Sequence, residues 1–337
     1  MKAFFITGPG TSEIGEIPAP RVVAGEVLLR TRIVGMCGSD LNTFRGRNPM
    51  VTYPRIPGHE IAATIEALGP DVPSQFQVGQ DVTVSPYTSC GACASCMRGR
   101  PNACRSNQTL GVQRDGAMTV LFVAPWQKLF ASEGLSLREL SLVEPLSVGF
   151  HAAARGRVDS GETVLVIGCG TVGLGAIAAA AFAGARVIAT DLEDQKLAIA
   201  AEAGAARLIN SSRESVADAL QELTGDRGPD VVIEAVGSPE TFRLAVEVVA
   251  FTGRVVYVGY AKEPVSYETK LFVQKELDIL GSRNALTEFP TVIAMLKERT
   301  FPVEKLISRT TGLDGAGDVL QAWSESPQSF SKILVEF

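Results

Sequence analysis

The sequence predicts an α/β protein in which a strand-rich region precedes a doubly wound parallel sheet. The first 150 residues are rich in β-branched residues, glycine and proline, whereas from Gly161 onward short apolar runs alternate with helical segments. Such apolar runs are typical of strands buried on both faces, as in a parallel sheet covered by helices. A chain of 337 residues is also long enough to form two domains, each with its own core.

The periodicity of apolar residues predicts the individual elements. In the strand-rich region we expect strands at residues 27–34, 60–67 and 81–85. In the second region the predicted strands are 163–167, 187–190, 207–209, 231–235, 255–258 and 277–280, and the predicted helices are 192–203, 215–223 and 241–249. After Gly281 the pattern predicts one helix near residues 289–299 and a closing strand at residues 332–337.

These elements predict the domain organisation. The first domain is expected at residues 1–150 and the second at residues 151–285. The remaining segment, residues 286–337, is too short to form a core alone, so we predict that it returns to the first domain.

Composition and charge argue against several classes of function. The net charge of −6 disfavours a general nucleic-acid-binding surface. The most apolar stretch, residues 174–185, is short and rich in alanine and glycine, which indicates a buried helix rather than a membrane span. The first ten residues lack the apolar core of a signal peptide, and we expect a cytoplasmic protein with reduced thiols.

A glycine-rich turn predicts a dinucleotide site in the second domain. Gly168 would permit a tight turn after the strand, Gly170 would let the backbone approach a pyrophosphate, and Gly173 would let the helix pack on the strand. The amides at the start of that helix, at Thr171 and Val172, would then face the phosphates.

The next strand of that domain favours NAD over NADP. Asp191 ends this strand, about 20 residues after the turn, where a carboxylate accepts hydrogen bonds from the ribose hydroxyls and repels a 2′-phosphate. Leu192 and Glu193 follow it, so no arginine is available there for a phosphate. Cys169, inside the turn, is expected to be a small packed residue rather than a reactive thiol.

Four of the six cysteines fall within fifteen positions, as Cys90, Cys93, Cys96 and Cys104. This spacing lets four thiolates bind one ion, and zinc held by four sulfurs forms a closed structural site. Disulfides or unligated thiols are the alternatives, but a long chain without an export signal has little need of disulfides. A structural zinc site is therefore predicted.

The segment that holds these four cysteines is called the four-cysteine lobe below. A second set of metal-ligand types lies outside it: Cys37, the adjacent His59 and Glu60, and Glu144. A thiolate, an imidazole and one or two carboxylates can bind zinc and leave a position open for a substrate oxygen. Each residue alone also has an ordinary structural interpretation, and because they are far apart in the sequence, spacing leaves both interpretations open. The other histidine, His151, is expected to be packed or exposed to solvent rather than ligating.

The order of these motifs resembles a known family. The motifs are GMCGSD at residues 35–40, GHE at 58–60, the four cysteines, EPLSVG at 144–149 and the glycine turn. In this order the chain resembles, essentially from end to end, the zinc-dependent medium-chain dehydrogenase/reductase family. Glu144, where alcohol dehydrogenases of the family have a cysteine, is similar to the polyol and threonine dehydrogenase branch.

The resemblance implies a GroES-like, β-rich catalytic domain with a structural zinc lobe, followed by a Rossmann NAD-binding domain. It implies Cys37 and His59 as ligands of a catalytic zinc, with Glu60 and Glu144 as direct or water-mediated ligands. A zinc ion is thus expected in each of the two sets, together with NAD. The resemblance also implies a homodimer or homotetramer formed through the edge of the Rossmann sheet.

The implied reaction is the reversible oxidation of a secondary alcohol to a ketone, in which zinc acts as Lewis acid and NAD carries the hydride. Ser39 is a candidate first proton acceptor. Related enzymes often have histidine where this chain has Asn42, and since an amide takes no proton near neutral pH, a histidine relay at this position is in doubt.

Finer likenesses point to the substrate. Residues 45–49, 53–55 and 281–285 resemble bacterial sugar-acid dehydrogenases of the L-galactonate/L-gulonate 5-dehydrogenase type, with Ser282 and Arg283 as expected cofactor contacts. A sugar acid carries a carboxylate, which favours a cation of bidentate geometry. The candidates are Arg45, Arg47, Arg114 and Arg283, although each alone also fits a solvated surface arginine.

Other functions remain open. The same scaffold could oxidise L-threonine or a neutral polyol such as sorbitol. A non-enzymatic NAD-binding protein is a further alternative, but it would leave Cys37, His59 and Glu60 without a role.

Overall fold

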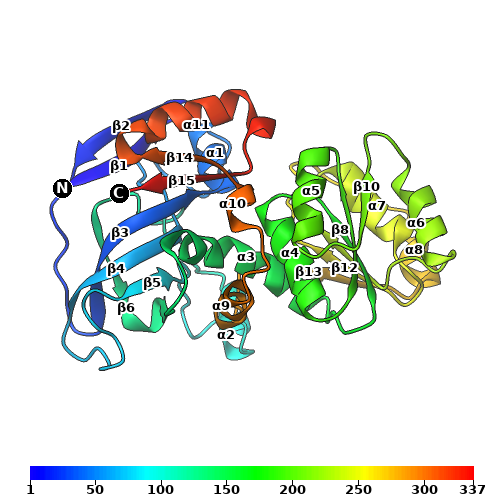
Figure 1. Cartoon of the computed structure of the whole chain (residues 1–337), viewed down its shortest axis with the longest axis horizontal. Helices are drawn as coiled ribbons and strands as arrows, with labels where there is room; N and C mark the ends of the chain where they lie inside the picture. The colour runs from blue at the N-terminus through cyan, green and yellow to red at the C-terminus, as the bar shows by residue number, and fades with distance from the viewer. The chain divides into compact units, whose positions relative to one another are not determined.

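The structure, a computed structural model, describes residues 1–337 and divides into two compact units (Figure 1). Unit 1 comprises Met1–Glu144, Phe289–Lys297 and Val303–Phe337, and unit 2 comprises Pro145–Glu288 and Glu298–Pro302. Helix α3 carries the chain from unit 1 to unit 2 and contains Pro145. No helix is both long enough and apolar enough to cross a membrane.

A seven-stranded sheet forms the frame of unit 1. Its strands follow the order β14-β15-β3-β4-β5-β7, with β6 paired to β3, while β1 and β2 form a separate antiparallel pair. The strands are β1 (Lys2–Gly8), β2 (Thr11–Glu16), β3 (Glu26–Met36), β4 (Glu60–Leu68), β5 (Asp81–Val84), β6 (Leu121–Pro125), β7 (Leu129–Ala131), β14 (Ile307–Gly312) and β15 (Lys332–Glu336). The helices are α1 (Gly38–Phe44), α2 (Ala94–Met97), α3 (Leu137–Arg155), α9 (Phe289–Lys297), α10 (Val303–Leu306) and α11 (Ala316–Glu325), with 3₁₀ turns η1 (Pro101–Ala103), η2 (Trp126–Lys128), η3 (Leu313–Gly315) and η4 (Pro327–Ser329).

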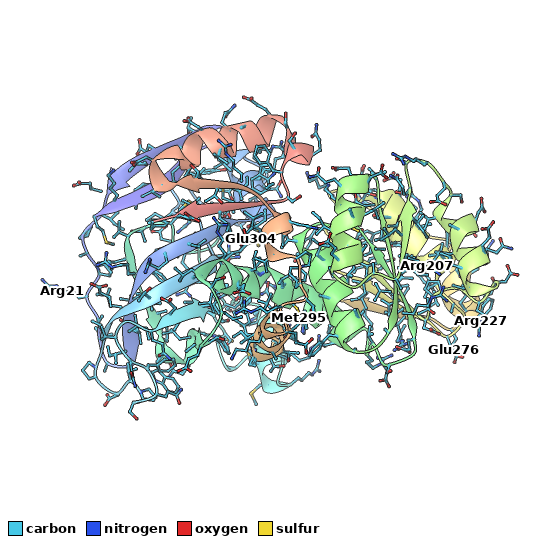
Figure 2. The ribbon with its side chains drawn as sticks, in the orientation of Figure 1. Arg21, Arg207, Arg227, Glu276, Met295 and Glu304 are labelled. Atoms are coloured by element: carbon cyan, nitrogen blue, oxygen red, sulfur yellow. The ribbon has the colours of Figure 1, made fainter.

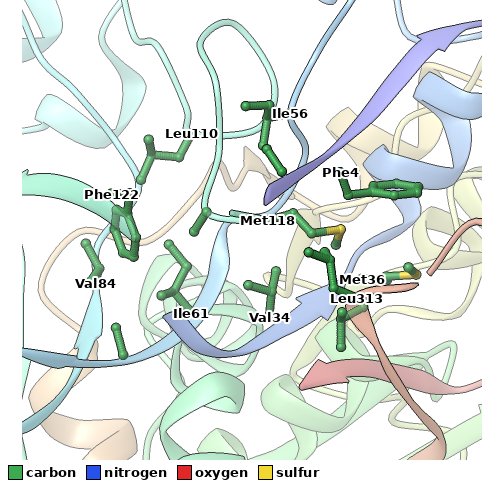
Figure 3. Packing of buried hydrophobic residues seen from close by; sticks show 14 of the residues in the cluster. Phe4, Val34, Met36, Ile56, Ile61, Val84, Leu110, Met118, Phe122 and Leu313 are labelled. Carbon is green, nitrogen blue, oxygen red and sulfur yellow. The ribbon is translucent and has the colours of Figure 1, made fainter. Parts of the chain in front are cut away.

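The core of unit 1 joins the two ends of the chain. Figure 3 shows Phe4 of β1, Val34 of β3 and Met118 packed in one cluster with Leu313, which lies near the end of the sequence. All four side chains are buried. Trp323 of α11 belongs to the same cluster. The C-terminal segment therefore has its apolar partners in unit 1.

The predicted strands of unit 1 are confirmed within about two residues as β3, β4 and β5. The prediction for the tail was incomplete, because it missed β14 and α11 between the predicted helix and the closing strand. The β14 sequence, ISRTTG, is mostly polar and has no fully buried residue, so it lacks the apolar alternation of a strand. Its pairing with β15 at the end of the sheet is what makes it a strand.

Unit 2 is a six-stranded, all-parallel sheet in the order β10-β9-β8-β11-β12-β13. Its elements are β8 (Thr163–Ile167), α4 (Thr171–Phe182), β9 (Arg186–Asp191), α5 (Asp194–Glu202), β10 (Arg207–Asn210), α6 (Val216–Thr224), β11 (Val231–Glu234), α7 (Pro239–Val248), β12 (Arg254–Tyr257), α8 (Lys270–Gln274) and β13 (Asp278–Gly281). The predicted strands and helices are confirmed, and so is the predicted buried helix, α4. Strand order reverses between β8 and β11, and ligands of such sheets bind at this point, beyond the carboxyl ends of the strands.

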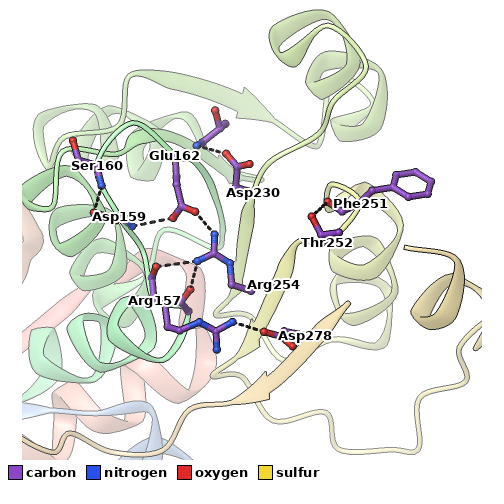
Figure 4. Close-up of polar contacts among 11 residues, drawn as sticks. Arg157, Asp159, Ser160, Glu162, Asp230, Phe251, Thr252, Arg254 and Asp278 are labelled. Carbon is purple, nitrogen blue, oxygen red and sulfur yellow. Dashed lines mark hydrogen bonds and ion pairs between the residues drawn. The ribbon is translucent and has the colours of Figure 1, made fainter. Parts of the chain in front are cut away.

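The amino ends of these strands are closed by polar contacts (Figure 4). The guanidinium of Arg254, at the start of β12, donates to the carbonyls of Gly156 and Arg157 at 2.9 Å each and pairs with Glu162. The side chain of Arg157 pairs in turn with Asp278, at the start of β13. These contacts hold the amino ends of β12 and β13, whereas the glycine turn follows the carboxyl end of β8.

Candidate metal centres and cofactor site

Three strand ends gather the second ligand set in unit 1. In the register of the sheet, Gly35 of β3 lies opposite Glu60 of β4, and Met36 lies opposite Ile333 of β15. Cys37 directly follows β3, and His59 directly precedes β4. Residues that are distant in the sequence therefore meet at one edge of the sheet.

The ligand atoms of Cys37, His59 and Glu60 all lie within 4.8 Å of one another. His59 and Glu60 are buried, and Nδ1 of His59 is enclosed without a hydrogen-bond partner. A buried polar nitrogen without a partner is unfavourable unless a ligand completes it. Because thiolate, imidazole and carboxylate are the ligand types of zinc, these residues fit a zinc ion.

Gly35 makes room for the carboxylate of this set. A Cβ atom at Gly35 would lie 2.0 Å from Oε2 of Glu60, which no side chain could tolerate. The glycine of the GMCGSD motif therefore allows the Glu60 carboxylate to lie directly over β3.

Glu144 reaches the same region from helix α3. Its Oε1 atom accepts a hydrogen bond from the hydroxyl of Tyr87, and both side chains are buried. Burial raises the pKa of Glu144, whereas His59 acts in the opposite direction. Glu144 is not within the 4.8 Å group, but it lies close enough to interact electrostatically with both His59 and Glu60.

The structure shows a buried ion pair beside this set that was not predicted from the sequence. Lys332, the first residue of β15, donates to both oxygens of Glu60, at 2.7 and 2.6 Å, and to the Met36 carbonyl at 3.1 Å. Although burial alone lowers the pKa of an ammonium group, Glu60 and Cys37 raise the pKa of Lys332. A lysine at the start of the otherwise apolar run KILV was the available signal.

Asp40 was also missed as a functional residue, although it lies in the GMCGSD motif. Its Oδ2 atom accepts the backbone amide of Cys37 at 2.9 Å, which fixes Cys37 at the start of α1. The three-residue spacing of a capping interaction was the signal for it.

The surroundings of His59 favour a cation. Burial alone would lower the pKa of His59, but Cys37, Asp40 and Glu144 raise it well above its usual range. Groups that attract a proton to the imidazole so strongly also attract a divalent metal ion, which competes with that proton.

The four-cysteine lobe has the geometry of a closed zinc site. The sulfurs lie 3.5 Å apart for Cys93–Cys96, 3.8 Å for Cys93–Cys104 and 3.6 Å for Cys90–Cys104. Four sulfurs placed tetrahedrally at 2.3 Å from one ion are about 3.8 Å apart. No cysteine of the chain forms a disulfide. The Ser95 hydroxyl and backbone amides lower the pKa of Cys93 to about 5, which favours the thiolate.

In unit 2 the glycine turn lies between β8 and α4, at the point where strand order reverses. A Cβ atom at Gly173 would lie 1.8 Å from the Gly168 carbonyl oxygen, whereas one at Gly170 would meet nothing within 4 Å. The backbone at Gly170 is therefore open to an approaching group, as a pyrophosphate site requires. Thr171 and Val172 follow in the first turn of α4.

Asp191 ends β9 and lies beside this turn. Its Oδ2 atom accepts the backbone amide of Cys169 at 2.8 Å, and its Oδ1 atom accepts that of Leu192 at 2.8 Å. Cys169 itself is buried, and burial raises the pKa of its thiol, which fits the predicted packing role.

Glu234 is a further residue that sequence reasoning missed. It is fully buried at the end of β11, and its Oε1 atom accepts the amides of Val236 and Gly237 at 2.9 and 2.8 Å. These contacts fix the loop beside Gly168, where Val236 packs. Ser282 follows β13, and its hydroxyl oxygen is buried without a partner; Arg283, next to it, is partly buried.

The other predicted side chains differ in their surroundings. The guanidinium of Arg45 donates to the hydroxyl and the carbonyl of Ser324 at the end of α11. Arg47 is exposed, Asn42 is partly buried in α1, and Arg114 is partly buried. The hydroxyl oxygen of Ser39 is buried without a partner.

Two family models match the chain: residues 171–298 match one described as zinc-binding dehydrogenase, and residues 23–133 match one described as alcohol dehydrogenase GroES-like domain. Sorbitol dehydrogenase of Bacillus subtilis (strain 168) is 34% identical over 342 residues, which cover 99% of this chain and 97% of that protein. The chain belongs to the zinc-dependent alcohol dehydrogenase family.

Other members of this family are similar over most of the chain. L-galactonate-5-dehydrogenase of Escherichia coli (strain K12) is 32% identical over 294 residues, covering 87% of this chain and 86% of that enzyme. The crystal structure of an alcohol dehydrogenase from Escherichia coli CFT073 complexed with NADH matches with a TM-score of 0.92 at 31% identity, covering 100% and 99% of the two chains.

The predicted family, fold class and enzyme class are therefore confirmed. The protein is an oxidoreductase of the zinc-dependent alcohol dehydrogenase family, built from a GroES-like domain and a Rossmann-type parallel sheet. The predicted cofactors, zinc and NAD, are those of the family.

Proposed function

We propose that this enzyme reversibly oxidises a secondary alcohol of a sugar acid to a ketone with NAD. The observation that carries the proposal is the set of Cys37, His59 and Glu60, of which the last two are buried and which offers a thiolate, an imidazole and a carboxylate to one zinc ion. A mixed set of this kind leaves a position for a substrate oxygen, unlike the four sulfurs of the lobe.

Each residue of the set has a proposed role. Cys37 and His59 hold the metal directly, while Glu60 and Glu144 provide the carboxylates, one bound by Lys332 and the other by Tyr87. When bound, zinc supplies Lewis acidity toward an alcohol and NAD accepts the hydride. The hydroxyl of Ser39, whose oxygen is buried without a partner, would receive the proton of the substrate alcohol and pass its own to a ribose hydroxyl of bound NAD or to a water molecule that enters with the substrate.

We propose NAD rather than NADP as the cofactor. Asp191 presents its carboxylate beside the glycine turn, where it would accept the ribose hydroxyls and repel a 2′-phosphate. Gly168, Gly170 and Gly173, with the amides of Thr171 and Val172, are the proposed pyrophosphate site. Ser282 and Arg283 are proposed as further cofactor contacts.

The sugar-acid substrate is supported by the 32% identity to L-galactonate-5-dehydrogenase. A neutral polyol is the second candidate, favoured by the 34% identity to sorbitol dehydrogenase. An assay of NADH formation with L-galactonate, L-gulonate, sorbitol, galactitol and L-threonine decides between them. We expect the highest kcat/KM with an aldonate; a preference for sorbitol or for L-threonine would refute the sugar-acid assignment.

We also propose that unit 1 is the catalytic domain and unit 2 the NAD-binding domain, and that the protein assembles as a homodimer or homotetramer. The edge strand β13 lies at the end of the six-stranded sheet, and its Ile279 is 40% exposed. An unpaired edge of this kind can pair with that of a second copy. Light scattering after size-exclusion chromatography tests this, and a monomer would contradict it.

A cytoplasmic location is proposed because the zinc lobe needs reduced thiols.

A further inference from the structure

We propose that Arg114 and Lys128 form an anion subsite in unit 1 that binds the substrate carboxylate next to the Cys37–His59–Glu60 centre. The identity of the anion rests on the proposed function. The subsite itself rests on the positions of the two cations and on the absence of an acidic side chain paired with either of them. Lys128 was not among the residues predicted from the sequence.

Arg114 lies on a loop that is fastened to the segments leading into the metal centre. The amide of Leu110 donates to the Pro86 carbonyl at 3.1 Å, and that of Ala117 donates to the Gly58 carbonyl at 2.9 Å. Tyr87, the partner of Glu144, follows Pro86, and His59 follows Gly58. The loop that carries Arg114 is therefore hydrogen-bonded to the two segments that contain Tyr87 and His59.

The side chain of Arg114 points back to the same place. Its Nη2 atom lies 3.5 Å from the Pro86 carbonyl oxygen, one residue before Tyr87. Lys128, at the end of η2, accepts the amide of Ser85 through its carbonyl at 2.8 Å. Arg114 and Lys128 therefore flank the short segment of Ser85 and Pro86, and the Arg114 charge lies close enough to lower the pKa of Lys128.

Neither cation has an acidic partner. Both side chains are partly buried, and no ion pair involves either of them. The Nε atom of Arg114 is buried without any hydrogen-bond partner. The adjacent carboxylate, Asp115, is turned away to Arg55 and pairs with it at 2.9 Å.

Two partly buried like charges without a counter-ion are an unfavourable arrangement. Burial lowers the pKa of Arg114, and burial together with the Arg114 charge lowers the pKa of Lys128. An anion placed between them would relieve the repulsion and complete the hydrogen bonds. A carboxylate suits this site, since a guanidinium binds it with paired N–H donors and an ammonium adds a point charge.

The experiment compares the wild-type enzyme with R114Q, K128M and the double variant. Exposed Arg21, labelled at the left of Figure 2, supplies the charge-matched control R21Q. Initial rates of NADH formation are measured with L-gulonate and, as the neutral counterpart, with sorbitol. Binding of L-gulonate to the zinc-loaded protein with NADH is measured separately by isothermal titration calorimetry.

We expect each single variant to lose about tenfold in kcat/KM for L-gulonate through a raised KM, and the double variant about a hundredfold. Turnover of sorbitol and all rates of R21Q should stay at the wild-type level. The calorimetric Kd for L-gulonate should rise in parallel. K128M keeps the test valid if R114Q folds poorly, because the Lys128 side chain makes no hydrogen bond in the structure.

The outcomes separate this proposal from the proposed function. If the wild type oxidises L-gulonate and the variants do so equally well, the subsite is refuted while the sugar-acid function stands. If the wild type oxidises only sorbitol, the sugar-acid function fails; L-gulonate binding that depends on both cations would still support the subsite. Binding that is absent, or unchanged in the double variant, would overturn the subsite.

Discussion

The two metal-ligand sets of unit 1 differ in almost every physical respect. The lobe is built from four like ligands within fifteen residues, and its Cys90 is exposed. The second set combines a thiolate, an imidazole and carboxylates from separate strand ends, and its His59 and Glu60 are buried. Ligand number and type thus separate the proposed structural site from the proposed catalytic site, which would keep a position for a substrate oxygen.

The surroundings of the two sets differ as strongly as their ligands. The sulfurs of the lobe accept hydrogen bonds from local backbone amides, such as those of Cys90, Cys93 and Ser106. The second set is enclosed by side chains from distant elements, including Tyr87 and Lys332. Local bonds suffice to hold a closed site, whereas an open site needs a tertiary frame that fixes each ligand separately.

Loss of Cys37 should have the largest effect on activity. C37A is expected to abolish turnover and to remove one of two zinc ions, because the remaining ligands cannot hold the metal in an open site. NADH binding, measured by fluorescence titration, should persist, since the dinucleotide residues lie in unit 2. Full activity of C37A would remove the distinction between the two sets.

Loss of Lys332 should have the largest effect on stability. K332M leaves the Glu60 carboxylate buried without its partner, and we expect a loss of about 3–5 kcal/mol in the free energy of unfolding. Urea denaturation measures it. The control K2M breaks an exposed pair with Asp314 and should cost less than about 1 kcal/mol.

The double variant K332M/E60Q sharpens this prediction. Because the buried charge is then removed together with its partner, the double variant should be more stable than K332M alone. Equal stability of the two would show that Glu60 is not the reason for the buried lysine.

Loss of the Ser39 hydroxyl should reduce the rate without removing metal. S39A is expected to lower kcat by about a hundredfold, the usual range for a proton-transfer group. Zinc content by atomic absorption should stay at the wild-type value. An unchanged kcat in S39A would contradict the proposal that Ser39 is the first proton acceptor.

Loss of a lobe ligand should have the smallest effect on chemistry. C104A removes a buried thiol of the lobe, so we expect loss of that zinc and a fall in Tm of at least about 5 °C. The kcat of the folded fraction should remain within about twofold of the wild type, because the open site keeps all of its ligands. A loss as complete as that of C37A would contradict the structural role of the lobe.

Local patterns were enough to predict much of the fold. The central strands of unit 2, β8, β9, β11 and β12, appear as apolar runs because most of their residues are buried, and β8 was predicted to the residue. The polar edge strand β14 and helix α11 were missed, because their place depends on β15 and on the core of unit 1 rather than on periodicity.

The sequence by itself determined the four-cysteine lobe and the glycine turn, because all the residues of each lie within a short span. It also named Cys37, His59, Glu60 and Glu144, although only the resemblance to a family joined them. The tertiary structure decided that the end of β3 meets the starts of β4 and β15, which places Lys332 on Glu60, and that Arg114 reaches the carbonyl of Pro86, the residue before Tyr87. Pairing between distant strands fixes such neighbours, and no local pattern records it.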